Sequence, residues 1–206
     1  MINLETLATE QQNSHSQHID SVSTEDMLRI INEEDHKVAD AVGAIIPAIA
    51  QAVDTIADKL RRGGRLFYMG SGTSGRLGIL DAVECPPTYS TDPERIQGLI
   101  AGGYEAIFRA KEGAEDSPEL GRQDLIDKNL TADDVVVGLS ASGRTPYVVG
   151  GLTYAASVGA ATIAIDCSPH SAIGRCADID LCAVVGPEVV TGSTRMKAGT
   201  AQKMIA

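Results

Sequence analysis

Apolar and polar positions follow a helical period in the first third of the chain. Apolar residues recur at steps of three and four along one stripe, formed by Val38, Val42, Ile45, Ile46, Ile49, Val53, Ile56 and Leu60. This spacing predicts a long amphipathic helix with one buried face. We expect Pro47 to kink this helix and Gly63-Gly64 to end it.

The residues before this stripe predict a polar arm and a shorter helix. Ser23 or Thr24 is a suitable cap for the start of that helix. Residues 1–22 are polar and include His15 and His18. We expect them to form an extended or flexible arm, which either lies in solvent or folds over a site, including a site in a partner subunit.

The pattern changes to alternating strands and helices after residue 63. Short apolar runs predict strands at residues 65–69, 96–101, 134–139, 161–165 and 179–185. The intervening helices are predicted at residues 77–83, 104–111 and 146–158, with one more that Ser117 caps. This order is typical of an α/β fold, here a three-layer αβα sandwich with a parallel sheet, preceded by N-terminal helices. In such folds ligands bind beyond the carboxyl ends of the strands.

Composition narrows the range of partners. The 206-residue chain has a net charge of −11, 3% aromatic residues and no Trp, which argues against nucleic acid and against anionic membranes as partners. Its four cysteines form no C-x-x-C pair, so we expect reduced thiols and no metal site. The first residues lack a secretory pattern, and no apolar run is long enough to span a membrane. We therefore expect a cytoplasmic protein.

Two loops after predicted strands carry the same chemistry. Residues 70–76 read Gly-Ser-Gly-Thr-Ser-Gly-Arg, and residues 140–145 read Ser-Ala-Ser-Gly-Arg-Thr. Glycine allows close backbone approach to an anion, and the following helix offers free N–H groups and a favourable dipole. The first loop is not followed by the Lys-Ser or Lys-Thr of a nucleoside-triphosphate site, and it lacks the acidic ribose partner that follows the glycines of a dinucleotide site. A phosphate monoester is therefore the expected ligand. The candidate ligands are the hydroxyls of Ser71, Thr73, Ser74, Ser140, Ser142 and Thr145.

Arg76 and Arg144 directly adjoin these loops. Each arginine could bind phosphate or pair with a structural carboxylate, and the sequence leaves both options open.

Five segments together resemble a known family. They are residues 70–76, Glu-Cys-Pro-Pro-Thr at 84–88, Lys-Glu-Gly-Ala-Glu-Asp-Ser at 111–117, residues 140–147, and the long segment 186–203. The loops resemble a sugar isomerase (SIS) domain, and the whole set is similar to the N-acetylmuramic acid 6-phosphate etherases. The last segment is shared mainly with the glucokinase regulatory proteins. The resemblance implies a SIS domain at residues 63–206 after an arm and packing helices at residues 1–62. Because that family continues into a helical C-terminal region, we expect the chain to be a fragment.

The resemblance implies a lyase that binds a small sugar phosphate. Such an enzyme eliminates D-lactate across C2–C3 of the open-chain sugar and then adds water, which leaves N-acetylglucosamine 6-phosphate. Such an enzyme needs no cofactor. The resemblance also implies a homodimer with the site near the interface.

The family's two acidic positions match Glu84 and Glu115. Glu84 is expected at the end of the helix at residues 77–83, where negative charge is disfavoured, which suits the acid that protonates the leaving group. Glu115 precedes the helix capped by Ser117, which suits an ionised base at C2.

The final segment supplies further residues that would contact the sugar or order the site. They are Glu188, Ser193, Thr194, Arg195 and Lys197. A Schiff base at Lys197 is disfavoured because direct enolisation suffices.

Two other functions fit the same loops. An aldose–ketose isomerase also removes a proton next to a carbonyl, and a non-catalytic regulator would only sense the sugar phosphate. The presence of both glutamates favours an enzyme over a sensor.

Overall fold

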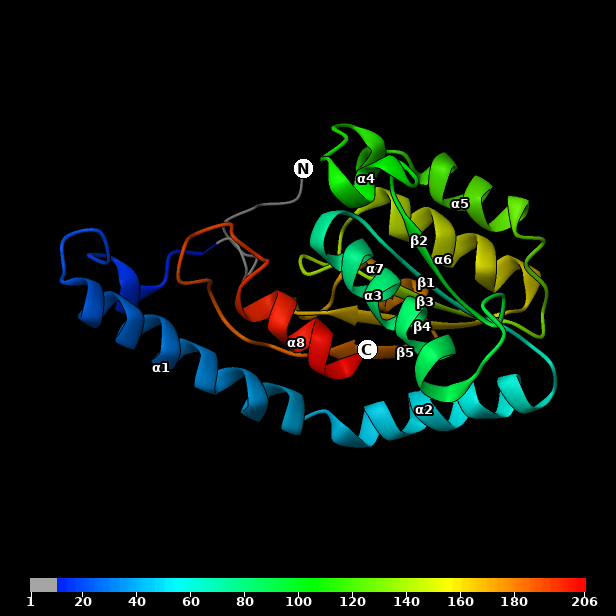
Figure 1. Ribbon diagram of the computed structural model, residues 1–206, viewed down its shortest axis with the longest axis horizontal. Coiled ribbons are helices and arrows are strands. Elements are labelled where there is room, and N and C mark those ends of the chain that lie inside the picture. Colours follow the sequence, from blue (N-terminus) through cyan, green and yellow to red (C-terminus); the bar gives the residue numbers. More distant parts are fainter. Residues whose placement is uncertain (1–10) are drawn as a thin grey trace.

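Five parallel strands form a single sheet in the computed structural model, which describes residues 11–206 (Figure 1). The order across the sheet is β2-β1-β3-β4-β5. The strands are β1 (Leu66–Gly70), β2 (Ile96–Ile100), β3 (Val135–Leu139), β4 (Ala161–Asp166) and β5 (Ile179–Cys182). Gly70 lies opposite Leu139 in the register, so the loops after β1 and β3 leave the same edge of the sheet side by side.

Helices cover both faces of the sheet. One layer contains α5 (Pro118–Asp127), α6 (Pro146–Val158) and α7 (Ala172–Cys176), and the other contains α2 (Ile46–Arg61), α3 (Gly72–Tyr89) and α8 (Lys197–Ile205). Alternate residues of each strand supply the two cores: Phe67 faces α5 and α6, whereas Leu66 faces α2. The predicted three-layer α/β sandwich is confirmed. The short elements are α4 (Glu105–Phe108) and the 3₁₀ helices η3 (Ser14–Ser16) and η4 (Ala114–Asp116).

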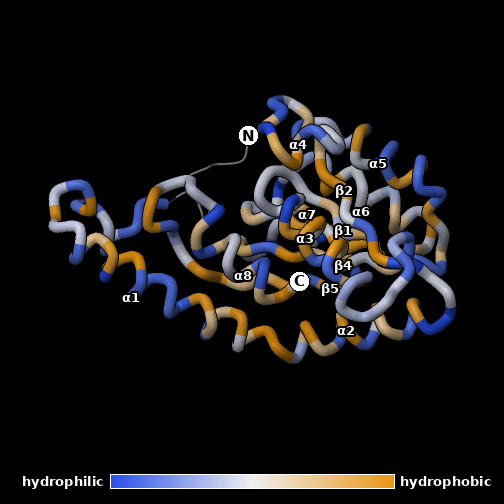
Figure 2. The backbone as a smooth tube through the Cα atoms, in the orientation of Figure 1, coloured by the Kyte–Doolittle hydropathy of each residue, from blue (hydrophilic) through white to orange (hydrophobic). Residues whose placement is uncertain are grey.

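The N-terminal helices differ from the prediction. The apolar stripe does not belong to one kinked helix, because α1 (Thr24–Gly43) ends first and α2 starts at Ile46 after a bend of 60°. Pro47 lies in the first turn of α2, where its missing N–H costs nothing. Hydrophobic and hydrophilic residues alternate along both helices (Figure 2), and α1 projects beyond the sandwich, with its C-terminal half against α8. Ser23 caps α1 as predicted.

Within residues 11–206, no single helix is long and apolar enough to cross a membrane. Only α1 and α2 taken together, as a bent pair, meet that test of length and composition.

Helix α3 is longer than predicted. It continues through Pro86 and Pro87 to Tyr89, so the expected end at residue 83 is wrong. Both prolines lie in the last turns, where each removes one hydrogen bond without stopping the helix. The left-handed Ser90 ends it.

Part of the polar arm packs against the protein. Residues 1–10 lie outside the described chain, but Asn13 and Ser16 are buried. Asn13 donates to the carbonyl of Pro187, and the Ser16 hydroxyl donates to the carbonyl of Val189 at 2.7 Å. The arm is therefore docked on the segment after β5 from residue 13 onward, whereas His15 and His18 are exposed.

Candidate active site

The two predicted phosphate loops line one cavity of about 490 Å³ at the carboxyl edge of the sheet. Residues from the loop after β1, the loop after β3, η4 and the segment before α8 surround it. The lining residues are Ser71, Gly72, Thr73, Ser74, Glu115, Asp116, Ser140, Ala141, Ser142, Arg144, Thr145, Pro146, Gly192 and Thr194. All six predicted hydroxyl ligands and Glu115 thus lie around the same space.

The first loop is joined to its surroundings through side chains. Ser71 Oγ donates to Glu115 Oε2 at 2.9 Å, and Ser74 Oγ donates to Gln202 Oε1 of α8 at 2.8 Å. Gly72, with φ +51, starts α3. The first N–H groups of this helix have no intrahelical acceptor, and they lie at the end of the helix that lines the cavity. Arg76 does not line this cavity: it donates to the carbonyls of Ala106 and Ile107, each at 2.7 Å. Its role there is structural, although its partners are carbonyls rather than carboxylates.

The second loop is held by bonds within itself and by backbone bonds to β4 and α7. The hydroxyls of Ser140 and Thr145 are 2.8 Å apart and share a hydrogen bond, and Gly143 N donates to Ser140 O. Gly143 has φ +67, and its carbonyl accepts from Ile173 N of α7. Thr145 then caps α6, whose first turn contains Pro146.

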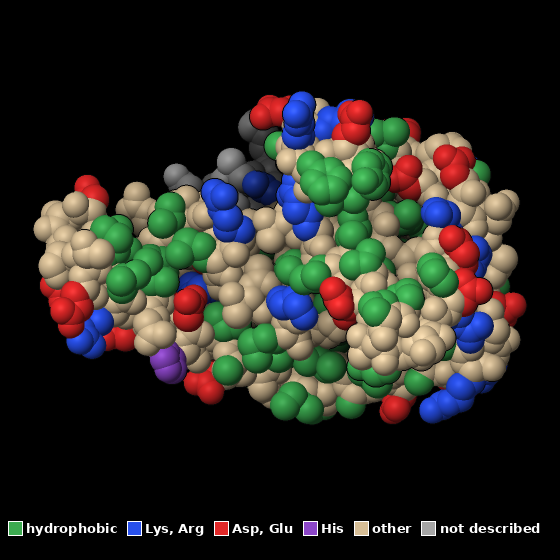
Figure 3. All heavy atoms as spheres, viewed as in Figure 1, with side chains coloured by type: hydrophobic (Ala, Val, Ile, Leu, Met, Phe, Trp, Pro, Cys, Tyr) green, Lys and Arg blue, Asp and Glu red, His purple; other side chains and the backbone are tan. Residues whose placement is uncertain are grey.

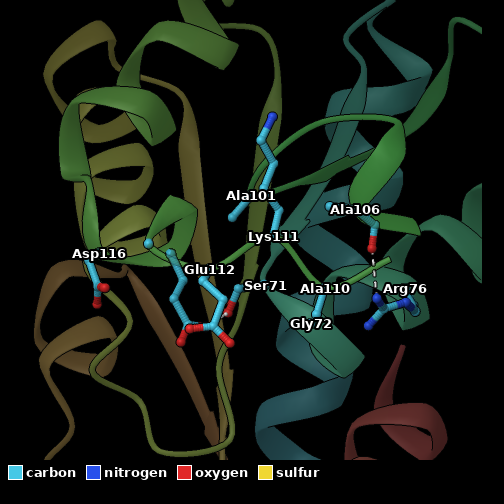
Figure 4. Close-up of a pocket in the computed structure, with 11 residues that line it drawn as sticks. Ser71, Gly72, Arg76, Ala101, Ala106, Ala110, Lys111, Glu112 and Asp116 are labelled. Carbon is cyan, nitrogen blue, oxygen red and sulfur yellow. Dashed lines mark hydrogen bonds between the residues drawn. The ribbon is translucent and has the colours of Figure 1, made fainter. Parts of the chain in front are cut away.

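Glu115 lies in η4, at the boundary with a second cavity of about 310 Å³. The two cavities share Ser71, Gly72, Glu115 and Asp116. Three alanines contribute to the second one, as do Arg76, Lys111 and Glu112. Figure 4 shows that the Lys111 side chain extends away from Glu112 and Ser71. Glu115 is therefore open to a ligand in either space.

Glu84 does not join this cavity. Because α3 begins at Gly72, Glu84 lies about 18 Å farther along the helix axis, at the roughly 1.5 Å rise per residue of an α-helix. Its side chain is exposed. Glu84 does not lie at a helix end as expected, since the helix continues to Tyr89.

Glu188 and Ser193 do not line the cavity either. Glu188 is fully buried and accepts from the N–H groups of Lys197 and Ala198 at 2.9 and 3.0 Å, so it caps α8. Burial raises its pKa, although these two N–H groups oppose the rise. Ser193 Oγ accepts from Arg195 Nε, while its neighbours Gly192 and Thr194 line the cavity. The segment therefore orders the site mainly through buried contacts.

A buried ion pair under this segment was missed by sequence reasoning. Lys197 Nζ lies 2.6 Å from Glu34 Oε2, with both side chains at most 2% exposed. Glu34 also accepts from Asn13 and Lys37 and lies 3.1 Å from His15 Nδ1. Burial alone would raise the pKa of Glu34, but the hydrogen bonds from Lys197, Lys37 and Asn13 lower it to about 2.

The position of Lys197 within the family segment was the only signal for that pair, since its partner lies 163 residues away. The pair excludes a Schiff base at Lys197 in this conformation, because the amine is buried against a carboxylate.

Two family models match the chain. Residues 117–206 match the SIS domain, and residues 48–156 match the glucokinase regulatory protein N-terminal SIS domain. The fold and the paired loops thus define a SIS-domain protein. A phosphoheptose isomerase from Francisella tularensis has the same fold, with a TM-score of 0.66 and 16% identity over 89% of this chain and 94% of that chain.

Curated relatives resolve the family further. The chain is 58% identical over 204 residues to the N-acetylmuramic acid 6-phosphate etherase of Clostridium beijerinckii, which covers 99% of this chain and 67% of that protein. It is 61% identical to the same enzyme of Vibrio vulnificus, over 99% of this chain and 68% of that protein. The chain belongs to the N-acetylmuramic acid 6-phosphate etherase family and spans about two thirds of the length of these relatives.

Proposed function

We propose that the protein is a carbon–oxygen lyase that cleaves the D-lactyl ether of N-acetylmuramic acid 6-phosphate. The proton at C2 leaves to a base, the C3–O bond breaks, and the lactate oxygen takes a proton from an acid. Water then adds across the C2–C3 double bond, which yields N-acetylglucosamine 6-phosphate and D-lactate. The observation that carries the proposal is the single cavity in which two hydroxyl-rich loops adjoin Glu115, in a chain of this family.

The two loops would hold the phosphate at C6. Ser71, Thr73, Ser142 and Thr145 offer hydroxyls, and the N-termini of α3 and α6 offer N–H groups and a favourable dipole. Phosphate bound there places the sugar chain beside Glu115, the base at C2. Elimination next to an aldehyde requires only positioned acid and base groups, so we propose that no cofactor takes part. The test of this point is an unchanged rate after exhaustive dialysis against a chelator.

Glu84 is proposed as the acid, and its location requires a second subunit. One chain cannot bring Glu84 and Glu115 to the same sugar, because Glu84 is exposed on the distal part of α3. Apolar side chains surround it on that helix: Val83 is 57% exposed and Tyr89 74% exposed. Hydrophobic side chains gather over α3 and α4 on the face shown in Figure 3. We propose that this surface forms a homodimer in which Glu84 of the partner subunit reaches the cavity beside Glu115.

Mixed dimers test this arrangement. Glu84→Gln and Glu115→Gln homodimers should each lose roughly 10²–10⁴-fold in kcat, the usual contribution of a positioned acid or base. After the two variants are unfolded and refolded together, about half of the dimers are mixed and contain one intact site. The mixture should then regain about a quarter of wild-type activity. Activity that stays at the level of the separate variants would overturn the shared site.

A lactate assay distinguishes the etherase from the other two candidates. The complete protein should release D-lactate from N-acetylmuramic acid 6-phosphate, whereas an isomerase or a sensor would not. In deuterated water, Glu84→Gln should still exchange the C2 proton while lactate release fails, and Glu115→Gln should do neither. No lactate from the wild-type protein would sink the proposal, and exchange retained only by Glu115→Gln would reverse the two roles.

We further propose the cytoplasm as the site of action, because the substrate is a phosphorylated sugar. Fractionation of cells that produce the protein should recover the lyase activity with the soluble cytoplasmic enzymes.

A further inference from the structure

The guanidinium of Arg144 lacks a partner in the part of the chain that the structure describes. Its side chain is half-buried and lines the cavity between the two loops. Two carboxylates, Glu115 and Asp116, line the same cavity, yet no ion pair or hydrogen bond joins Arg144 to either one. A cation in that position points to an anion that arrives from outside.

The other half-buried arginines of residues 11–206 show how this chain normally treats such a group. Each of the three has its guanidinium satisfied within the protein. Their partners are Asp134 for Arg65, the carbonyls of Ala106 and Ile107 for Arg76, and the carbonyl of Leu60 for Arg95. Partial burial of a charge without a partner costs free energy. Arg144 is thus the exception among them, and it is the one that faces the ligand space.

The phosphate does not need this arginine. Hydroxyls and helix N-termini surround the expected phosphate position with neutral donors, a set that suits a phosphate monoester. The proposed substrate carries a second anion, the carboxylate of its lactyl group, which is attached through O3 and therefore lies away from C6. A planar guanidinium binds a carboxylate with two parallel hydrogen bonds. Among the described residues that line this cavity, Arg144 is the only cation.

We propose that Arg144 binds the lactyl carboxylate and selects sugar phosphates that carry this second anion. The inference rests on the proposed function. It also predicts weaker binding of the sugar product than of the substrate, because elimination detaches the carboxylate from the sugar. The remaining sugar phosphate then loses the contact with Arg144 and keeps only its phosphate contacts. Sugar phosphates without an acidic substituent would lack that contact from the start.

The experiment compares two ligands that differ by the lactyl group. N-acetylmuramic acid 6-phosphate is assayed as the substrate of the complete protein, and N-acetylglucosamine 6-phosphate is titrated by calorimetry. Arg144→Gln should raise KM for the substrate by roughly 10- to 100-fold, the usual loss for a hydrogen-bonded charge. The affinity of this variant for N-acetylglucosamine 6-phosphate should stay within about twofold of wild type, because this ligand has no lactyl carboxylate and loses no contact with Arg144.

Two further variants control the result. Arg144→Lys keeps the charge but not the planar guanidinium that can make two parallel hydrogen bonds. Its KM should therefore lie between those of the wild type and Arg144→Gln. Arg109→Gln removes an exposed arginine from the loop after α4 and should leave both ligands unaffected. If Arg144→Gln weakens both ligands equally, the arginine binds phosphate and the inference is wrong. If it changes neither ligand, the inference is equally overturned, while lactate release by the wild type would still support the lyase. No lactate from the wild type would remove the proposed function itself.

Discussion

The loops at residues 70–76 and 140–145 have similar compositions and follow adjacent strands, but the protein anchors them in different ways. The first is anchored by side chains, because Ser71, Ser74 and Arg76 all bond to other elements. The second is anchored by its backbone, where Gly143 O accepts from α7, and its arginine has no partner among the described residues. One sequence pattern can therefore be anchored through its side chains or through its backbone, and the difference lies in what surrounds it.

The glycines of the two loops should separate them most strongly. Gly143 and Gly72 both have positive φ, but a Cβ on Gly143 would lie 2.2 Å from Ser171 Cβ, whereas one on Gly72 would meet nothing within 4 Å. Gly143→Ala should lower the free energy of unfolding by roughly 3 kcal/mol, and Gly72→Ala by about 1 kcal/mol. Urea denaturation measures both. Equal losses would mean that α7 does not restrict the second loop.

The pH dependence of the unfolding free energy should originate at Asp166, which lies beside the second loop. Burial raises the pKa of Asp166 to about 6, although a hydrogen bond from the Ser171 hydroxyl beside Gly143 opposes the rise. The folded protein therefore keeps a proton that the unfolded chain, with a pKa of 3.8, releases first. This contribution to stability is complete below about pH 4 and is lost as the pH rises through about 6.

Asp166→Asn should remove that loss, which amounts to roughly 3 kcal/mol. The measurement is the difference in unfolding free energy between wild type and variant at several pH values from 4.5 to 7. Parallel curves would contradict the assignment. Glu34 does not interfere in this window, because its lowered pKa makes its own contribution decline only at more acidic pH.

The arginines provide a further contrast in stability. Arg76→Gln should lower the free energy of unfolding by about 1–3 kcal/mol, since two carbonyls lose a charged donor. Arg144→Gln should change it by less than about 0.5 kcal/mol, because it removes no hydrogen bond or ion pair among the described residues. Thermal unfolding of the two variants gives the comparison. A large loss in Arg144→Gln would show a structural role that the inference above does not allow.

The sheet and the cavity could be predicted because their signals are local. Each apolar run is a strand at nearly the expected residues. The two loops lie together because β1 and β3, which they follow, are neighbours in the sheet. Helix ends at prolines could not be predicted in the same way. Pro47 starts a helix and Pro86 lies within one, and only the tertiary position of each ring decides which.

Contacts between distant segments explain the rest of what was missed. Glu34 and Lys197 each look like surface charges in the sequence, and only the packing of α1 against α8 buries them together. Its place in the same segment predicts that Glu188 is a sugar ligand, but its carboxylate faces the start of α8. Membership of a motif therefore predicts that a residue matters without predicting which way it points.

The hydrogen bond between Ser71 and Glu115 has a consequence for the order of events in the cavity. A serine hydroxyl has one proton and can donate it to one acceptor at a time. In this structure that acceptor is Glu115 Oε2. A phosphate bound by Ser71 would accept this hydrogen bond in place of Glu115, which leaves the glutamate oxygen with a free lone pair. The proposed base would thus become available at the moment the sugar phosphate is seated.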